Sequence, residues 1–285
     1  MVRSRGSMPR LRRLFFPIDE RAFTYRSYVK LLDELRDGSR YRVVPLRDFS
    51  TTRDPDRAVV SLRHDVDERL DRALDFAKLE HDRGLPSTYF VLHTAAYWKA
   101  PTLVETLVEM QDVLGHEIGW HNDLVTVECV MGGDARRLLS TELQRLRLAG
   151  LRIDGTASHG SPLCRRYGYH NGYFFFGDTP LPGFPNLHVV DGPRGRVAVP
   201  HGTLEEFGFA YEAYHLDNGI YYSDAAYGKS GRRWHTDEVD LQTLAPGARA
   251  VILTHPDHWD ASLLHKFARF GSKLRYGLRR KSWIE

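Results

Sequence analysis

Four short segments of the chain combine carboxylates and imidazoles directly after runs of apolar or β-branched residues. They lie at 62–67, 115–123, 157–162 and 251–259. Carboxylate oxygens and imidazole nitrogens are the ligands that Zn²⁺ and similar divalent ions take in proteins. Where strands of a parallel sheet end together, such side chains meet at one edge. The four segments therefore predict a metal or acid–base site.

The first segment, 63–67, reads RHDVD. On a strand, side chains alternate between faces, so Arg63, Asp65 and Asp67 share one face and His64 points to the other. Two neighbouring carboxylates repel each other unless a cation lies between them or one is protonated. The pair therefore predicts a cation site, although Asp67 alone is also a candidate cap for the following helix.

The second segment, 115–123, reads GHEIGWHND and holds two histidines. The metalloprotease motif HExxH needs its histidines four residues apart on a helix, a spacing that this segment does not have. Gly119 and the β-branched context favour a strand, which points His116 and His121 to opposite faces. We therefore expect His121, at the carboxyl end, to be a metal ligand and His116 to be structural.

The third segment, 157–162, reads ASHGSP. His159 before a glycine suits a ligand or a hydrogen-bonding group in a tight turn, and an ordinary turn histidine is the alternative. Ser158 and Ser161 raise the question of a nucleophilic serine. The GxSxG signature of serine hydrolases is absent, which disfavours that chemistry.

The fourth segment is an apolar strand that delivers His255, followed by Pro256. An imidazole fixed in a pocket can act as a general acid near neutral pH. Trp259 is predicted to stack on a sugar ring, with a buried core position as the alternative, and Asp224 ends a further strand. Together with Arg63, these two residues are predicted to contact substrate.

Strand and helix patterns alternate around these segments. The predicted strands cover 58–62, 87–92, 117–121 and 153–158, and the predicted helices between them cover 70–79, 103–114 and 135–149. This alternation predicts an α/β fold with a parallel sheet. Segment 161–205 is rich in glycine and proline and is predicted to be an insertion bordering the site. Regular structure is expected again at 207–214, 219–223 and 250–254.

The composition narrows the class of protein. Of 285 residues, 42% are hydrophobic, which excludes disorder, and the formal net charge of +3 is too small to indicate a nucleic-acid partner. Two cysteines exclude a disulfide framework. No stretch approaches the roughly 20 apolar residues of a membrane span, and the start does not resemble a signal peptide. These features predict a cytoplasmic protein.

The predicted organisation is a basic tail at 1–22, a single barrel domain at 23–265 and a basic helix at 266–285. A basic amphipathic helix can lie on an anionic membrane, which predicts peripheral contact with the inner membrane face. The alternative is an ordinary helix that covers the barrel and keeps a solvated basic face.

The order of the four motifs resembles that of the polysaccharide deacetylase superfamily, the NodB-homology or family 4 carbohydrate esterases. RHDVD resembles the first family motif, EIGWH the second, SHGSP the third and Leu253-Thr254-His255 the fifth. More narrowly, RHDVD with TYFVL, GHEIGWH and THPDHW resembles deacetylase-like proteins of bacterial surface-polysaccharide genes. The resemblance covers about residues 58–260 and implies a distorted (β/α)7 barrel.

The resemblance also implies roles for single residues. Asp65 corresponds to the catalytic base, Asp67 to a metal ligand, His121 to a second ligand and His255 to the catalytic acid. The implied cofactor is a divalent metal ion, Zn²⁺ first, with Co, Ni, Mn and Fe as alternatives. The implied substrate is an amino sugar or glycoconjugate that carries an acyl group, N-acetyl first.

The chain departs from the family pattern at two positions. The second motif usually supplies another histidine at position 125, which is Val125 here, and His159 stands where the third motif has an arginine. We infer that His159 replaces the missing ligand, which gives the set Asp67, His121 and His159. Asp224 is the alternative third ligand.

Three other functions stay open at this point. A hydrolase of another non-peptide C–N bond shares the same barrel and chemistry. A catalytically silent carbohydrate-binding protein accounts for the loss of a ligand at Val125. Asp65-Val66-Asp67 is also the DxD pattern of glycosyltransferases, but that function leaves His121 and His255 without a role.

Overall fold

A computed structural model describes residues 24–224, 232–233 and 241–259 of the chain. Its main sheet has the strand order β10-β9-β11-β2-β3-β4-β5-β8, and β1 pairs with β2. Every pairing within this sheet is parallel. The strands are β1 (Tyr41–Val43), β2 (Ala58–Val66), β3 (Ser87–Leu92), β4 (Glu117–Asn122), β5 (Ile153–Ser158), β8 (Tyr211–Glu212), β9 (Ile220–Ser223), β10 (Arg232–Arg233) and β11 (Arg249–Thr254).

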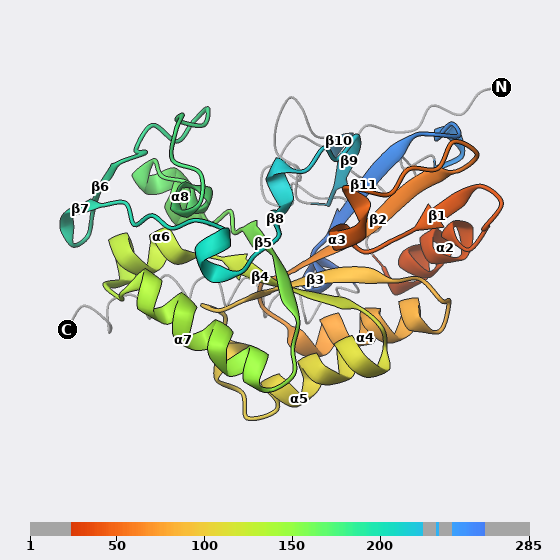
Figure 1. Cartoon of the computed structure of the whole chain (residues 1–285), viewed down its shortest axis with the longest axis horizontal. Coiled ribbons are helices and arrows are strands. Elements are labelled where there is room, and N and C mark those ends of the chain that lie inside the picture. Colours follow the sequence, from red (N-terminus) through yellow and green to blue (C-terminus); the bar gives the residue numbers. More distant parts are fainter. Residues whose placement is uncertain (1–23, 225–231, 234–240, 260–285) are drawn as a thin grey trace, which may run out of the picture.

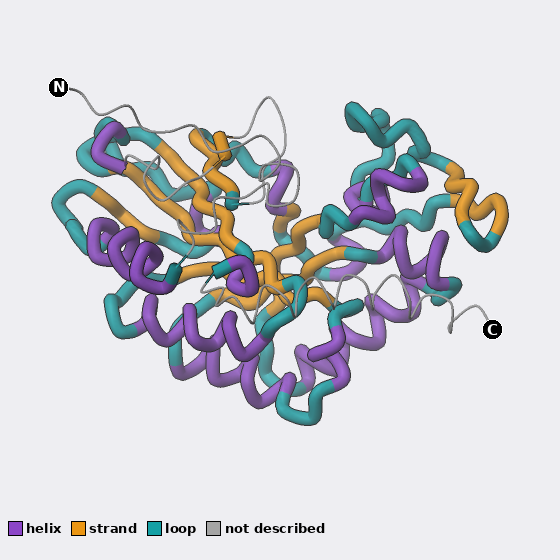
Figure 2. The backbone as a smooth tube through the Cα atoms, turned by 180° about the vertical axis from the view of Figure 1, so that it is seen from behind, coloured by secondary structure: helices purple, strands orange, loops and turns teal. Residues whose placement is uncertain are grey.

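Helices flank this sheet, and α4, α5 and α7 form a layer beneath it in Figure 1, seen from behind in Figure 2. The helices are α2 (Tyr25–Leu35), α3 (Leu46–Phe49), α4 (Leu70–His81), α5 (Leu103–Val108), α6 (Leu124–Thr126), α7 (Ala135–Leu148) and α8 (Pro162–Tyr167). The sheet curls into a parallel half-barrel, and α4, α5 and α7 cover its outer face. This confirms the predicted α/β class and its distorted barrel form.

The strand patterns predict the structure well where the strands are buried on both faces. β3 and β5 have the predicted bounds, and β2 and β4 run further than predicted, to Val66 and Asn122. Two predictions were wrong in part. The helix expected over 103–114 changes to a π-helical turn after Val108. The regular structure expected over 207–214 is interrupted, because Gly208 adopts φ +69°, the strand covers only Tyr211–Glu212, and the Glu212 side chain caps the 3-10 helix that follows.

Segment 161–205 is well structured and lies at the end of the molecule opposite α2 and β1 (Figure 1). It contains α8, a short 3-10 helix (Asn171–Phe174) and the antiparallel hairpin of β6 (Val189–Gly192) and β7 (Gly195–Ala198). The predicted tail at 1–22 and the predicted basic helix at 266–285 lie outside the described residues. No helix among the described residues is long and apolar enough to cross a membrane.

A buried network of polar side chains ties the sheet to α4. Glu80 of α4 is 0% exposed and accepts hydrogen bonds from Ser87 (2.5 Å) and Tyr89 (2.6 Å), while its Oε1 lies 2.7 Å from His64 Nε2. The other ring nitrogen of His64 lies 2.6 Å from the Thr254 hydroxyl. His64 therefore points to the helix side of β2, as the alternation predicts, and joins β2 to β11.

This network makes the stability of the fold dependent on pH. Burial raises the pKa of Glu80, but the neighbouring His64 and the hydrogen bonds outweigh burial and lower it from 4.5 to about 2. A lowered carboxyl pKa stabilises the folded state above pH 4.5, and this stabilisation is lost as the pH falls toward 2.

We expect the difference in unfolding free energy between the wild type and Glu80→Gln to shrink as the pH falls from 4.5 to 2, as measured in urea titrations. Glu205→Gln, an exposed site, serves as control. A difference that stays constant from pH 5 to 2 contradicts the prediction.

Candidate metal and acid–base site

Asp67, His121 and His159 converge where β2, β4 and β5 end. Each contributes one possible ligand atom, and these atoms lie within 4.8 Å of one another. Asp67 Oδ1 is 3.3 Å from His121 Nε2 and 3.8 Å from His159 Nε2. The structure therefore brings together the three residues inferred from the sequence to be metal ligands. One carboxylate and two imidazoles are a donor set that suits Zn²⁺ and similar ions.

The surroundings of Asp67 test whether the site suits a cation. Its Oδ1 is buried and accepts no hydrogen bond from the described residues. It does not cap a helix either, because α4 has Arg69 at its N-cap and no capping side chain. Burial raises the pKa of Asp67, but His159 and His121 outweigh burial and hold it well below its usual value. A buried, ionised oxygen without a hydrogen bond fits a metal ligand.

Neighbouring oxygens orient the two imidazoles. Nδ1 of His121 lies 2.8 Å from the Ala157 carbonyl, so it donates there, and Nε2 is the ring nitrogen on the side of Asp67. Nδ1 of His159 lies 3.4 Å from Asp123 Oδ1. Burial lowers the pKa of His159, but Asp67 and Asp123 outweigh it and raise the pKa to about 9. Without a cation in place, the site binds a proton instead.

Asp65 forms a buried ion pair with Arg63 beside these three residues. Arg63 Nε donates to Asp65 Oδ1 and Nη2 donates to Oδ2, both at 2.8 Å. Burial raises the pKa of Asp65, but Arg63 and His121 lower it by more, so the carboxylate stays ionised. Arg63, which the sequence predicted to contact substrate, has a side chain that is only 1% exposed and donates two hydrogen bonds to Asp65. The alternation that places both residues on one face was the signal in the sequence.

His255 lies next to Asp65 because the strand register pairs Thr254 of β11 with His64 of β2. Its Nδ1 is 2.6 Å from Asp224 Oδ1, and its backbone N–H donates to Asp224 Oδ2 at 2.8 Å. Burial lowers the pKa of His255, but Asp224 outweighs burial and raises it to about 10. The imidazole is therefore protonated at neutral pH, as a general acid must be.

Asp224 binds the ring of His255 and is itself held by Trp259. Asp224 is 2% exposed and also accepts a hydrogen bond from Trp259 Nε1 at 3.1 Å. Trp259 is 1% exposed, and its ring packs against Tyr28 at 5.2 Å and Phe76 at 5.9 Å. Both residues were predicted to contact substrate, and the structure places both side chains in the interior behind His255. Asp224 also belongs to a separate cluster with His255 and His258, not to the metal triad.

The remaining histidine and serines of the motifs have structural partners. The Ser158 hydroxyl donates to Glu212 at 2.9 Å, and the Ser161 hydroxyl caps α8, so neither hydrogen bonds to a histidine in the described part of the chain. This disfavours a serine nucleophile. His116 bridges the Ser87 hydroxyl and the Ala77 carbonyl at 2.8 and 2.9 Å, as expected of a structural histidine.

The sequence missed two residues next to the triad. Asp123 follows β4, two residues after His121, and is 1% exposed against His159. His93 follows β3, stacks on Trp120 at 4.6 Å and accepts the backbone N–H of Asp123 at 3.1 Å. Both stand at strand ends, which was the available signal.

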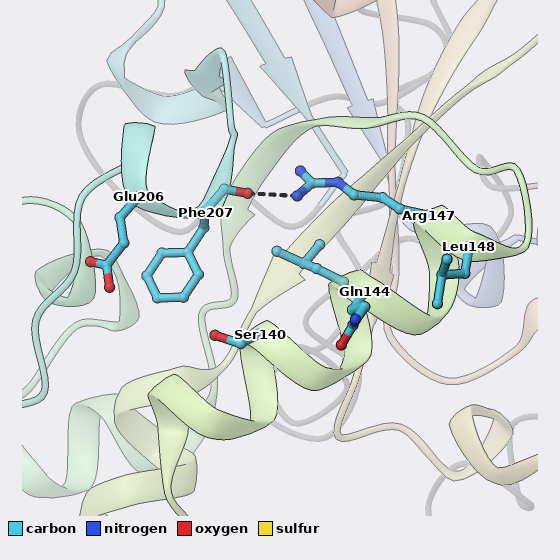
Figure 3. A pocket seen from close by; sticks show the side chains of 7 residues that line it. Ser140, Gln144, Arg147, Leu148, Glu206 and Phe207 are labelled. Atoms are coloured by element: carbon cyan, nitrogen blue, oxygen red, sulfur yellow. Dashed lines mark hydrogen bonds between the residues drawn. The ribbon is translucent and has the colours of Figure 1, made fainter.

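A cavity of about 430 Å³ lies apart from these residues, between α7 and the 3-10 helix Glu205–Phe207 (Figure 3). Its lining residues are Ser140, Leu143, Gln144, Arg147, Leu148, Glu206 and Phe207. Arg147 is held there by the Phe207 carbonyl at 2.9 Å. No residue of the triad and neither ion pair lines this cavity, so it does not define the site.

No family model and no curated protein matches the sequence. Among solved structures, the chain is similar to a chitin deacetylase from the fungal pathogen Colletotrichum lindemuthianum, with 16% identity, 75% of this chain and 78% of that chain covered, and a TM-score of 0.39. It is also similar to a family 4 carbohydrate esterase from Bacillus anthracis, with 13% identity and a TM-score of 0.36. This match covers 88% of this chain and 86% of that chain. A CE4 esterase from Streptococcus mutans shows 13% identity and a TM-score of 0.34, and the match covers 92% of this chain and 90% of that chain. These neighbours are carbohydrate esterases and deacetylases, the family that the motifs resemble. The chemistry of the site follows from this chain's own residues.

The raised pKa of His159 predicts that metal binding displaces a proton. Below its pKa of about 9, a divalent ion must compete with the proton on this imidazole. We expect the apparent affinity for Zn²⁺ to rise by about tenfold per pH unit between pH 7 and 9. Calorimetric titration in buffers of different ionisation enthalpy measures the released proton directly. His188→Gln, at an exposed histidine outside the triad, serves as control and should keep the pH dependence of the wild type. An affinity for the wild type that is independent of pH contradicts the prediction.

Proposed function

We propose that this chain is a metal-dependent hydrolase that removes an acyl group, N-acetyl first, from an amino-sugar-containing substrate. One observation carries the proposal: the cluster of Asp67, His121 and His159 lies beside a buried carboxylate and a buried imidazole at the ends of neighbouring parallel strands. The pKa of Asp65 is lowered and that of His255 is raised. Groups whose environments drive their pKa values apart suit the roles of base and acid.

The metal would be held by Asp67 Oδ1 and by one ring nitrogen each of His121 and His159. When bound, a divalent ion supplies Lewis-acid chemistry, since it lowers the pKa of water to about 7 and polarises an amide carbonyl. Zn²⁺ is the first candidate for two imidazoles and one carboxylate, with Co, Ni, Mn and Fe as alternatives.

Asp65 acts as the base that accepts a proton from the attacking water. Its ionised carboxylate is ready for this at neutral pH, and the two hydrogen bonds from Arg63 hold it in one orientation. Its Oδ2 lies 3.7 Å from His121 Nε2, so the base adjoins the proposed metal ligands. Arg63 thus supports the base from within the same motif, although the family places an arginine in its third motif.

His255 acts as the acid that protonates the departing amine nitrogen. Asp224 binds the Nδ1 side of the ring and stabilises the imidazolium, which leaves the Nε2–H to be donated. Proton transfer to the leaving nitrogen lets the C–N bond break without releasing an amide anion. Base and acid come from β2 and β11, which are adjacent in the sheet.

The acylated amino sugar rests on the resemblance of the motifs. A hydrolase of another non-peptide C–N bond uses the same residues and remains the second candidate. The DxD glycosyltransferase is less well supported, because it leaves His121 and His255 without a role. A silent carbohydrate-binding protein is the outcome that the first experiment below tests.

Metal content tests the proposal most directly. We expect elemental analysis of protein purified without chelators to find about one divalent ion per chain, as in other three-ligand sites. His159→Ala should lose the ion, and His188→Ala, an exposed histidine, should keep it. The loaded wild type should then release acetate from N-acetylated amino sugars or their oligomers. A wild-type chain without metal, even after reconstitution, contradicts the hydrolase and supports a silent binding protein.

The role of His255 predicts a loss of rate without a loss of metal. We expect His255→Ala to lower kcat by about 10²–10⁴ because the leaving amine is no longer protonated. Acetate release and metal content are measured on the same preparations. His258→Ala is the matched control: this ring stacks on His255 at 4.7 Å, and its removal should cost much less. Turnover near the wild-type rate in His255→Ala removes it from the mechanism.

A further inference from the structure

The carboxylate of Asp123 lies behind the metal triad, against the side of His159 that faces away from Asp67. Its Oδ1 is 3.4 Å from His159 Nδ1, while His159 Nε2 is 3.8 Å from Asp67 Oδ1. His159 Nδ1 is buried and forms no hydrogen bond in the described part of the chain, so the Asp123 carboxylate is the acceptor within reach. A carboxylate on this side favours the tautomer with the proton on Nδ1 and leaves the Nε2 lone pair for a metal.

Asp123 is itself held firmly by neighbours from three directions. Its Oδ2 accepts a hydrogen bond from the Thr94 hydroxyl at 2.8 Å, and its backbone N–H donates to His93 Nε2 at 3.1 Å. Its Oδ1 accepts a hydrogen bond from Asn171 Nδ2 at 2.8 Å. With 1% of its surface exposed, the carboxylate is in a position set by other parts of the fold.

Asn171 connects Asp123 and His159 to segment 161–205. Its Nδ2 also donates to the backbone carbonyl of His159 at 2.8 Å, and its Oδ1 accepts the backbone N–H of Thr126 at 3.1 Å. Its own carbonyl accepts a hydrogen bond from Asn122 Nδ2 at 3.0 Å. One side chain that is 0% exposed thus links the loops after β4 and β5.

The two imidazoles of the triad differ in what orients them. His121 stands within β4, and a backbone carbonyl of the adjacent strand binds its Nδ1. His159 follows the end of β5 and has no such strand partner for its ring. A ligand outside regular structure needs a side chain to fix its ring, and Asp123 is placed to do so.

We propose that Asp123, held by Asn171 and Thr94, is a positioning residue that orients His159 for metal binding. This inference rests on the proposed function, since it takes the triad to be a metal site. It assigns to segment 161–205 a part in building the site, through Asn171. It also accounts for how His159 serves as a ligand although position 125 is a buried valine.

Metal affinity of the full-length chain tests this role without relying on activity. The metal-free wild type and the variants Asp123→Asn and His159→Ala are titrated with Zn²⁺ in competition with a chelator, and Co²⁺ absorption reports on the ligands. Asp123→Asn keeps the shape of the side chain and removes its charge. We expect it to weaken Zn²⁺ binding by about 10- to 100-fold and to shift the Co²⁺ spectrum toward that of His159→Ala.

Glu117→Gln is the matched control, because Glu117 is also a buried carboxylate, 1% exposed, but starts the same strand β4 at its other end. Its Zn²⁺ affinity should equal that of the wild type. Equal losses in both variants indicate general disruption of packing and overturn the inference. Wild-type affinity in Asp123→Asn overturns it as well, while the metal site and the proposed function stand.

Thr94→Val gives a second, milder test in case Asp123→Asn does not fold, as judged by circular dichroism. It removes one hydrogen bond to Asp123 and leaves the charge. We therefore expect the Zn²⁺ affinity to fall measurably, but by less than about tenfold. An unchanged Zn²⁺ affinity in Thr94→Val counts against the inference, and so does an unchanged affinity in Asp123→Asn that folds. A wild type that binds no divalent ion overturns the proposed function and this inference together.

Discussion

Carboxylates buried at the ends of parallel strands must each be matched by a positive charge or by hydrogen-bond donors, because an isolated buried anion is very costly. Asp65 meets this demand with the guanidinium of Arg63, and Asp224 meets it with His255. Asp67 lies beside the imidazoles of His121 and His159, but its buried Oδ1 accepts no hydrogen bond from the described residues. This arrangement supports the proposal that a cation binds between the three side chains.

The alternation of β2 separates the reactive face from the face that stabilises the fold. Asp65 faces the site, while His64, one residue earlier, points to α4 and meets the fully buried Glu80. His64 also contacts Thr254, the neighbour of His255. The same strand pair therefore carries the proposed base and acid on one side and a buried polar network on the other. Rigid support of this kind keeps functional groups in a fixed geometry.

Neighbouring charges hold Asp65 and His255 in opposite protonation states. Arg63 keeps Asp65 ionised, whereas Asp224 keeps His255 protonated, so both forms that the proposed amide hydrolysis needs coexist at neutral pH. The proposed metal triad lies next to the proposed base, and Asp123 adds a further negative charge behind it. Negative charge around the proposed ligands favours the binding of a divalent cation.

The sequence by itself determined the features that depend on local periodicity. Alternation along a strand is set by the backbone, so it predicted the bounds of β3 and β5, the opposite faces of His64 and Asp65, and which strand ends carry polar side chains. The tertiary structure alone decided the partners of those side chains. Trp259 and Asp224 turned out to support His255, and Asn171 reaches Asp123 across 48 residues of sequence. Such contacts depend on how distant segments pack in three dimensions, and no local pattern encodes that packing.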